Sequence, residues 1–124
     1  DALTLEETHL ALSMVETRAH AAGVTEYILD PAIGLWQNSR TVDLDWELCR
    51  NFRDFTTYMR PLLAAVSRKS FLGGLVGKAP AGRLAVSLAM AALLVCNGAD
   101  MIRTHDVADT RDAILVAERM KRDQ

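Results

Sequence analysis

The stretch that decides the fold is PLLAAVSRKSFLGG, residues 61–74. Residues 61–66 form a continuous apolar run, which is typical of a strand that is covered on both faces within a parallel sheet. The run stops at Ser67-Arg68-Lys69-Ser70, where a basic pair lies between two serines, and glycines follow. We therefore predict a buried strand whose carboxyl end carries a cationic, hydrogen-bonding loop.

Two shorter segments, one on each side of this stretch, also have the character of strands. TEYILD, residues 25–30, ends at Asp30-Pro31, because the position before proline resists helix and proline cannot extend a central strand. ADMIR, residues 99–103, predicts a further strand. The three predicted strands are separated by segments long enough for one helix each, so the pattern favours parallel pairing.

Helical periodicity fills the segments around these strands. Thr4 and Glu7 have the spacing of a capping box and predict a first helix that ends at Gly23. A second predicted helix ends before Arg60, and a third covers residues 81–96. Asp109 is the predicted N-cap of the last helix. The predicted buried faces are Thr8, Leu12, Val15, Ala19 and Ala22, then Leu44, Leu48, Phe52, Phe55 and Met59, and finally Ala113, Ile114, Val116, Ala117 and Met120. A helix followed by three strand and helix repeats predicts an α/β fold with right-handed crossovers, in a single domain over residues 1–124.

Composition excludes several classes of protein. A formal net charge of −2 over 124 residues gives no basic field that would attract nucleic acid, so we expect no nucleic-acid partner. The most apolar run, residues 84–96, is shorter than the roughly 18 residues that span a bilayer, so we also expect no membrane partner. Cys49 and Cys96 lack metal-type spacing and are interpreted as reduced, buried thiols, which favours a cytoplasmic location.

The three predicted strands end in polar residues at what should be the same rim of the sheet. Asp30 ends the first strand, Ser67 to Ser70 follow the second, and Arg103 to Asp106 follow the third. Ligands of parallel α/β sheets bind beyond the carboxyl ends of the strands. The guanidinium, ammonium and hydroxyl groups there, together with His105, suit a phosphate or pyrophosphate. Asp30 could accept paired hydrogen bonds from an amino-substituted ring, or it could form an Asx turn before Pro31.

Three motifs carry a family resemblance. ILDPAIG (28–34), VSRKSFLGG (66–74) and GADMIRTHDV (98–107), in this order and with these separations, resemble the last three strand-end motifs of dihydropteroate synthase. The resemblance implies a three-strand, C-terminal portion of a TIM (β/α)8 barrel. It also implies the family's reaction, in which 6-hydroxymethyl-dihydropterin pyrophosphate condenses with para-aminobenzoate in folate biosynthesis and pyrophosphate is released with Mg²⁺. The metal ligand is expected in the N-terminal portion of such a barrel, and no metal ligand is assigned in this sequence.

The resemblance also implies roles for individual residues. Asp30 would bind the polar edge of the pterin, and Lys69 would contact the same ring. Arg103 would stack on the pterin and hold the departing phosphates, with His105 on the pyrophosphate side, so that Lys69, Arg103 and His105 are the predicted catalytic residues. The predicted border of the aminobenzoate pocket is formed by Ser67 and Arg68.

The sequence departs from the family pattern at two alanines and one tripeptide. Ala32 and Ala65 stand where the family generally has glycine, and Leu35-Trp36-Gln37 replaces its usual Phe-Gly-Lys. Each alanine adds a methyl group near the predicted pocket, where glycine often permits close approach of the backbone.

Two other functions and two kinds of association stay open at this point. The chain could be a non-catalytic assembly module that keeps the motifs of the pterin-binding family, or a domain similar to methyltetrahydrofolate methyltransferases. Three parallel strands would leave exposed edges and an uncovered barrel interior. We therefore expect either a homodimer or association with the remaining portion of the barrel.

Overall fold

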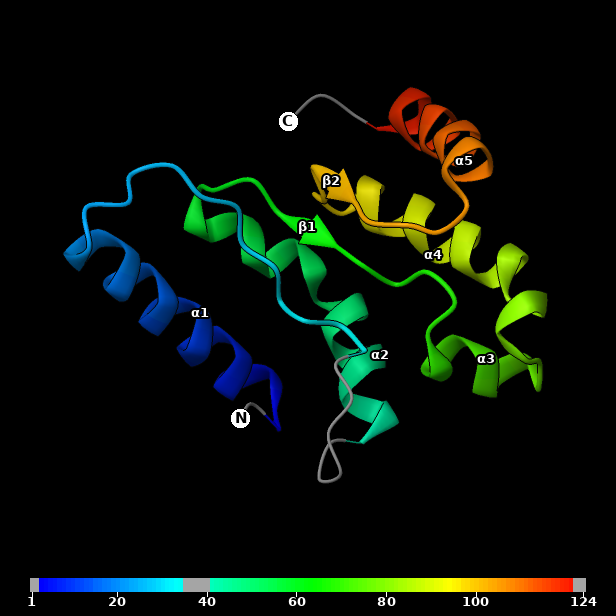
Figure 1. Ribbon diagram of the computed structural model, residues 1–124, viewed down its shortest axis with the longest axis horizontal. Coiled ribbons are helices and arrows are strands. Elements are labelled where there is room, and N and C mark those ends of the chain that lie inside the picture. The colour runs from blue at the N-terminus through cyan, green and yellow to red at the C-terminus, as the bar shows by residue number, and fades with distance from the viewer. Residues whose placement is uncertain (1–2, 35–40, 122–124) are drawn as a thin grey trace.

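The computed structural model describes residues 3–34 and 41–121, and the chain runs from α1 at one end of the molecule to α5 at the other (Figure 1). Its helices and strands are, in order, α1 (Leu5–Ala21), α2 (Val42–Arg50), the 3-10 helix η1 (Phe52–Tyr58), β1 (Leu63–Ala64), α3 (Ser70–Val76), the 3-10 helix η2 (Pro80–Gly82), α4 (Leu84–Cys96), β2 (Met101–Ile102) and α5 (Val107–Met120). The predicted second and third strands are present as β1 and β2, whereas the predicted first strand, residues 25–30, is not a strand and makes only an isolated bridge.

The predicted strands lie side by side and run parallel, but each is short. β1 pairs with β2 in the register Leu63 with Met101, and the predicted first strand makes a single parallel bridge from Leu29 to Leu62. The backbone N–H of Arg103 donates to the carbonyl of Ala64 at 3.0 Å, so pairing continues up to the loop after β2. The carboxyl ends of all three segments therefore lie at one edge, as the parallel arrangement predicted.

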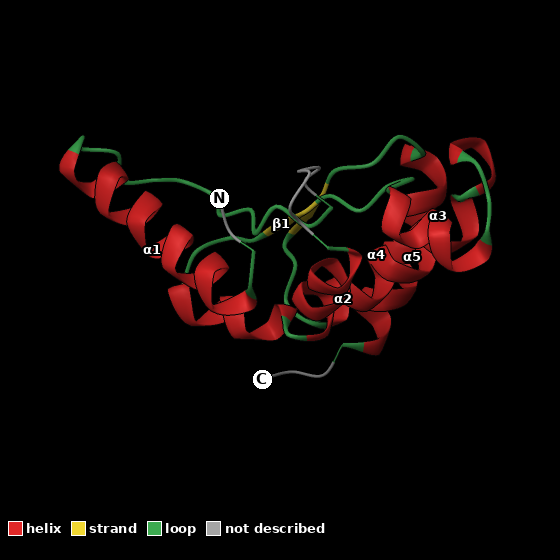
Figure 2. Ribbon diagram, turned by 90° about the horizontal axis from the view of Figure 1, so that it is seen from below, coloured by secondary structure: helices red, strands yellow, loops and turns green. Residues whose placement is uncertain are grey.

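One face of these strands is the core of the protein. Leu29, Leu62, Ala64 and Val66 alternate toward the helices and are all buried, because strand side chains point to opposite faces in turn. Helices α2, α4 and α5 lie on one side of the strands (Figure 2). The core is completed by buried side chains of the helices, among them Phe52, Phe55, Phe71 and Leu94.

The opposite face of the strands is apolar and open. Ile28 and Met101, which alternate with the core residues, are each 45% exposed. Because strand side chains alternate between faces, these two residues point away from the face that carries Leu29 and Leu62. An uncovered apolar sheet face of this kind agrees with a piece of a barrel, in which the same side chains would fill the barrel interior.

Helix α1 begins as its sequence predicted. The hydroxyl of Thr4 accepts from the Glu7 backbone N–H at 3.0 Å, and the Glu7 carboxylate accepts from the N–H of Leu3 at 2.8 Å. This is the reciprocal pattern of a capping box, except that the Glu7 carboxylate accepts from the backbone N–H of Leu3 and not from that of the N-cap residue Thr4. Val15 is 49% exposed and Ala22 is also exposed, so the predicted burial of both residues is wrong.

The predicted second helix is in fact two elements. α2 ends at Arg50, and the chain tightens into the 3-10 helix η1 after Asn51. Met59, predicted to be buried, is 87% exposed because it takes the left-handed conformation (φ 57°) that ends η1. The prediction there is wrong because a regular helical period was extended past the residue where the backbone turns.

The C-terminal half contains two further differences. The short helix α3 was not predicted, since its glycines suggested a loop. α5 begins after Asp106, whose carbonyl accepts from the N–H of Thr110 at 2.9 Å, so Asp109 lies in the first turn and is not the N-cap. The predicted burial of Val116 and Met120 is also wrong, because both side chains are exposed on α5.

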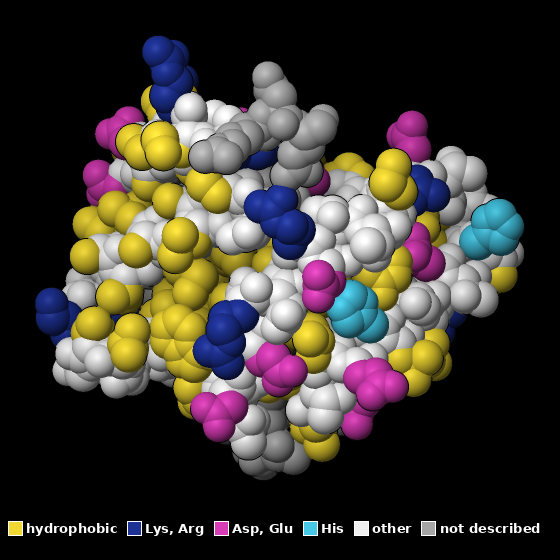
Figure 3. Space-filling view, turned by 180° about the vertical axis from the view of Figure 1, so that it is seen from behind, with side chains coloured by type: hydrophobic (Ala, Val, Ile, Leu, Met, Phe, Trp, Pro, Cys, Tyr) yellow, Lys and Arg dark blue, Asp and Glu magenta, His cyan; other side chains and the backbone are white. Residues whose placement is uncertain are grey.

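Helix α4 is apolar on every side, and part of this apolar surface is exposed. Hydrophobic side chains gather on the half of the rear face that α3, α4 and α5 form (Figure 3). Leu93 on α4 and Leu115 on α5 are among the exposed residues. Within residues 3–34 and 41–121, no helix has both the length and the hydrophobicity that a membrane crossing requires.

Candidate functional site

A cavity of about 250 Å³ lies at the carboxyl edge of the strands. Its lining comes from the end of β1 and the loop that follows it, and from the loop after β2: Ala65, Ser67, Lys69, Arg103, Thr104 and His105. Two of these side chains are cationic, and three others carry a hydroxyl or an imidazole. The cavity therefore offers positive charge together with hydrogen-bond donors, which is the chemistry that binds phosphate groups.

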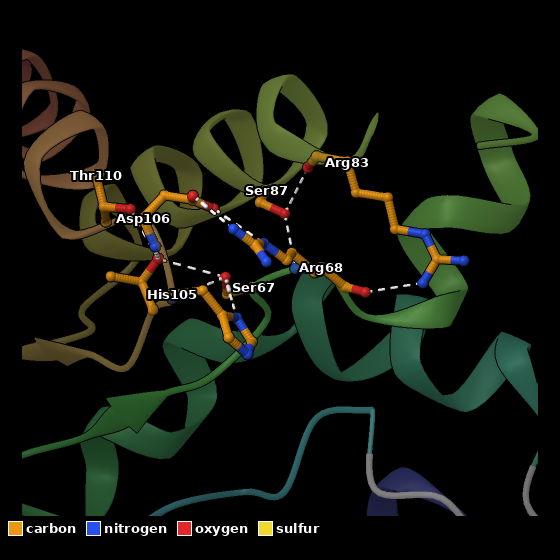
Figure 4. Close-up of polar contacts among 8 residues, drawn as sticks. Ser67, Arg68, Arg83, Ser87, His105, Asp106 and Thr110 are labelled. Carbon is orange, nitrogen blue, oxygen red and sulfur yellow. Dashed lines mark hydrogen bonds and ion pairs between the residues drawn. The ribbon is translucent and has the colours of Figure 1, made fainter. Parts of the chain in front are cut away.

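The loop after β1 is held in place by hydrogen bonds to its own backbone. The N–H of Lys69 donates to the carbonyl of Val66 at 3.1 Å, which closes a tight turn with Arg68 in the left-handed region (φ 58°). The N–H of Arg68 donates to Ser87 Oγ at 2.8 Å, and its carbonyl accepts from Arg83 Nη1 at 2.8 Å (Figure 4). Both partners come from the start of α4, so this helix fixes the conformation of the cationic loop.

Arg68 is not among the residues that line the cavity, and its side chain reaches Asp106 in the loop after β2. Its guanidinium donates to both oxygens of Asp106, at 2.7 Å from Nη2 and 3.2 Å from Nε (Figure 4). These hydrogen bonds raise the pKa of Arg68 and lower the pKa of the Asp106 carboxyl. A bidentate pair fixes the orientation of both groups, so it ties the two strand-end loops together.

Ser67 makes a second link between the same two loops. Its hydroxyl lies 2.8 Å from His105 Nδ1 and accepts from the His105 backbone N–H at 3.1 Å (Figure 4). Ser67 is only 8% exposed, whereas His105 is exposed. The serine therefore holds the imidazole at the cavity wall from the buried side.

The loop after the first predicted strand is positioned by groups outside it. Lys69 Nζ donates to the carbonyl of Ile33, and Asp45 of α2 accepts from the N–H of Gly34 at 2.7 Å. A methyl group built on Gly34 would collide with Lys69 Cδ, so the lysine side chain lies directly against this glycine. Lys69 therefore lines the cavity and also contacts the loop of residues 30–34.

Asp30 and Ala32 form a local turn within that loop. Asp30 Oδ1 accepts from the N–H of Ala32 at 2.9 Å, so the Asx turn, which the sequence left open beside a binding role, is present. Ala32 has φ 62°, a left-handed conformation that is unfavourable for a residue with a side chain. This finding explains why a glycine suits position 32, and it differs from the prediction that the alanine acts through its methyl group alone.

The structure thus brings four of the six predicted site residues to one cavity. Lys69, Ser67, Arg103 and His105 line it, whereas Arg68 bonds to Asp106 and Asp30 caps its own turn beside the loop that Lys69 contacts. Sequence reasoning assigned no role to several residues that build the site, namely Thr104, Asp106, Arg83, Ser87 and Asp45. The tripeptide Leu35-Trp36-Gln37 lies outside the described residues.

Comparison with known proteins fits this geometry. A family profile described as "Pterin binding enzyme" matches residues 2–105, which is most of the chain. This chain belongs to the pterin-binding enzyme family. The matched residues include all three strand ends and every residue that lines the cavity.

Individual relatives in this pterin-binding family agree. Dihydropteroate synthase of Escherichia coli K12 is 36% identical over 103 residues, which cover 82% of this chain and 36% of that protein. Among solved structures, a dihydropteroate synthase from Coxiella burnetii in complex with pteroic acid has a TM-score of 0.88 at 34% identity, covering 93% of this chain and 43% of that one. The enzyme from Thermus thermophilus has a TM-score of 0.87 at 30% identity, covering 97% and 47%.

These values confirm the predicted fold class. The chain is an α/β, partial piece of a pterin-binding barrel, and it spans about a third of the length of the curated relatives and less than half of the solved chains.

Proposed function

We propose that this chain supplies part of the active site of a dihydropteroate synthase. The observation that carries the proposal is the single cavity at which Lys69, Arg103 and His105 meet from two neighbouring strand ends, in a chain of the pterin-binding family. The proposed substrates are 6-hydroxymethyl-dihydropterin pyrophosphate and para-aminobenzoate. Pteroic acid, the ligand of the Coxiella burnetii enzyme, joins the same two chemical halves, which supports this choice.

The proposed reaction needs no protein nucleophile. The amine of para-aminobenzoate forms a bond to the pterin methylene carbon while the carbon–oxygen bond to pyrophosphate breaks. The pyrophosphate leaves with the bonding electron pair, and the proton lost by the amine passes to solvent. Cationic groups fixed where this negative charge develops would accelerate the step, because they need no reorganisation during the reaction. Lys69 and Arg103 are suited to this role.

The remaining residues have proposed binding roles. The Asp30 carboxylate uses one oxygen in its turn, so its second oxygen is proposed to accept from the polar edge of the pterin. His105 is proposed to contact the pyrophosphate, and Ser67 to lie at the aminobenzoate side of the cavity. For Arg68 we propose an indirect role at that border, since its guanidinium is bonded to Asp106.

Magnesium is proposed to assist departure of the pyrophosphate. Within residues 3–34 and 41–121, no three His, Cys, Asp or Glu side chains are grouped closely enough to hold a metal ion. From the resemblance to dihydropteroate synthase, we propose that the metal ligand is supplied by the N-terminal portion of a family barrel, and that Lys69 and Arg103 provide the positive charge from this side.

The open sheet face supports a proposal about association. Ile28 and Met101 are exposed apolar residues that alternate along the strands with the buried core residues. We propose that the remaining strands of a barrel cover this face, or that a second copy of the chain does so. The same observation favours the second candidate function, a non-catalytic assembly module, for which binding of a partner would not require the cavity.

Measurement of pyrophosphate release tests the enzyme proposal. The protein is incubated with the pterin pyrophosphate, para-aminobenzoate and Mg²⁺, with and without the N-terminal portion of a family barrel. We expect release that depends on para-aminobenzoate, that falls at least tenfold in Lys69→Ala, and that is unchanged in the matched control Lys78→Ala, whose side chain is exposed away from the cavity. Partner binding without any release would instead favour the assembly module.

A further inference from the structure

A chain of hydroxyl groups lies behind His105, on the side away from solvent. Thr110 Oγ1 is 2.8 Å from Thr104 Oγ1, which donates to Ser67 Oγ at 3.4 Å, and Ser67 Oγ is 2.8 Å from His105 Nδ1. Thr110 and Ser67 are 3% and 8% exposed, so water has little access to this end of the chain. The protein groups must therefore satisfy one another's hydrogen-bonding capacity.

With the Thr104 hydroxyl as the donor to Ser67 Oγ across 3.4 Å, a count of protons assigns a direction to every other bond. A serine hydroxyl has one proton and two acceptor sites. Ser67 Oγ accepts from the His105 backbone N–H and from the Thr104 hydroxyl, so both acceptor sites are used. Its own proton is left for the third neighbour, His105 Nδ1.

The same count holds at the next residue along the chain. Thr104 uses its proton toward Ser67 and accepts from the backbone N–H of Asp106 at 3.3 Å. Its second acceptor site then takes the proton of Thr110. Every hydroxyl in the chain therefore donates toward the imidazole, and His105 Nδ1 is the final acceptor.

A neutral imidazole carries its proton on one nitrogen only. Because Nδ1 accepts, the proton lies on Nε2, on the side of the ring away from Ser67. The cavity that His105 lines also contains Lys69 and Arg103. A ligand there meets an N–H donor and two cations, and it does not meet an unprotonated imidazole nitrogen.

We propose that Ser67, supported by Thr104 and Thr110, is a positioning residue that fixes neutral His105 in the Nε2–H tautomer, so that His105 donates a hydrogen bond to an anionic phosphate oxygen and does not act as a general base. The inference rests on the proposed function for the identity of the anion. The tautomer itself follows from hydrogen bonds within the protein.

The tautomer is tested by ¹⁵N NMR of the histidine side chains at about pH 8, where imidazole is ordinarily neutral. We expect His105 Nδ1 to have the shift of an unprotonated nitrogen and Nε2 that of a protonated one. In Ser67→Ala the signals should move toward a mixture of tautomers, Ser67→Thr should restore them, and Ser13→Ala, at an exposed site on α1, should change nothing. A protonated Nδ1 in the unsubstituted protein would overturn the inference.

The donor role is tested by titrating the same proteins with inorganic pyrophosphate in a calorimeter. A glutamine side chain places an amide donor near the position of Nε2, whereas an asparagine places it near Nδ1. We therefore expect His105→Gln to bind within about threefold of the unsubstituted protein, and His105→Asn to lose about tenfold, the usual effect of one hydrogen bond to a charged group. Equal losses in both variants would overturn the donor role. If the protein shows the Nε2–H signal but does not bind pyrophosphate, the proposed function and the identity of the anion are wrong. The assignment of the His105 tautomer would still hold in that case.

Discussion

Replacing Ala32 by glycine should stabilise the protein, although it removes a methyl group. Ala32 has φ 62°, and the left-handed conformation costs an alanine about 1–2 kcal/mol relative to glycine. Glycine also lowers the stability by about 0.4–1 kcal/mol, because it increases the conformational entropy of the unfolded chain. The net gain is about 0.5–1 kcal/mol, which corresponds to a rise in Tm of about 2–4 °C at about 2.1 cal/mol/K of unfolding entropy per residue.

Ala65→Gly is the matched control, because the family generally has glycine at that position too. Ala65 has no left-handed backbone and lies in the cavity wall, so glycine there should lower the free energy of unfolding by about 0.5–1 kcal/mol. Urea denaturation followed by circular dichroism measures both variants. Opposite signs are expected. A loss of stability in Ala32→Gly, or equal effects in the two variants, would refute the argument from backbone conformation.

Three further predictions concern the site and the core. Gly34→Ala should be more destabilising than Gly23→Ala in urea denaturation, since both glycines have positive φ but only the first contacts the lysine of the cavity. The ion pair with Arg68 lowers the pKa of Asp106 below its usual 3.8. The stability that this ion pair contributes is therefore complete above pH 3.8 and is lost as the pH falls through the lowered pKa. Asp106→Asn should remove this acid dependence in a pH series of unfolding curves. Burial raises the pKa of the Cys49 thiol to about 12, so alkylation followed by mass spectrometry should leave it unmodified in the native protein at about pH 8.

Each of these predictions has a result that would contradict it. Equal losses of stability in Gly34→Ala and Gly23→Ala would mean that the contact with the lysine has no energetic consequence. If unfolding of Asp106→Asn kept the acid dependence of the unsubstituted protein, other carboxylates would be responsible for it. Rapid native labelling of Cys49 would show that the core around α2 opens readily.

The strand ends could be predicted from sequence because the signals there are local. A continuous apolar run that stops at a polar quartet predicts the buried strand that contains β1, although β1 ends at Ala64, two residues before the run does. The parallel arrangement then brings Arg103 and His105 to the same edge. The cavity formed by Lys69, Arg103 and His105 was therefore predictable in composition, and four of the six predicted site residues line it.

The support of the site was not predictable from sequence, because it depends on contacts between distant segments. Nothing local to Asp45 indicates that its carboxylate accepts from the Gly34 backbone, and nothing local to Ser87 indicates that it holds Arg68. Helical periodicity also failed at Met59, where a left-handed residue ends η1. The orientation of the Arg68 side chain follows from its ion pair with Asp106. The sequence motifs place the two residues on neighbouring strand ends, but they do not predict which way the Arg68 side chain points.

Calorimetric titration of the protein with inorganic pyrophosphate tests most directly whether the strand ends form one anion site. Lys69→Ala and Arg103→Ala should each weaken binding about tenfold, the usual effect of removing a charged hydrogen-bond donor, because the two residues line the same cavity from different strands. Arg111→Ala, at an exposed position on α5, should bind as tightly as the unsubstituted protein. Pyrophosphate affinity that is unchanged in both cavity variants, with the fold intact, would contradict the account.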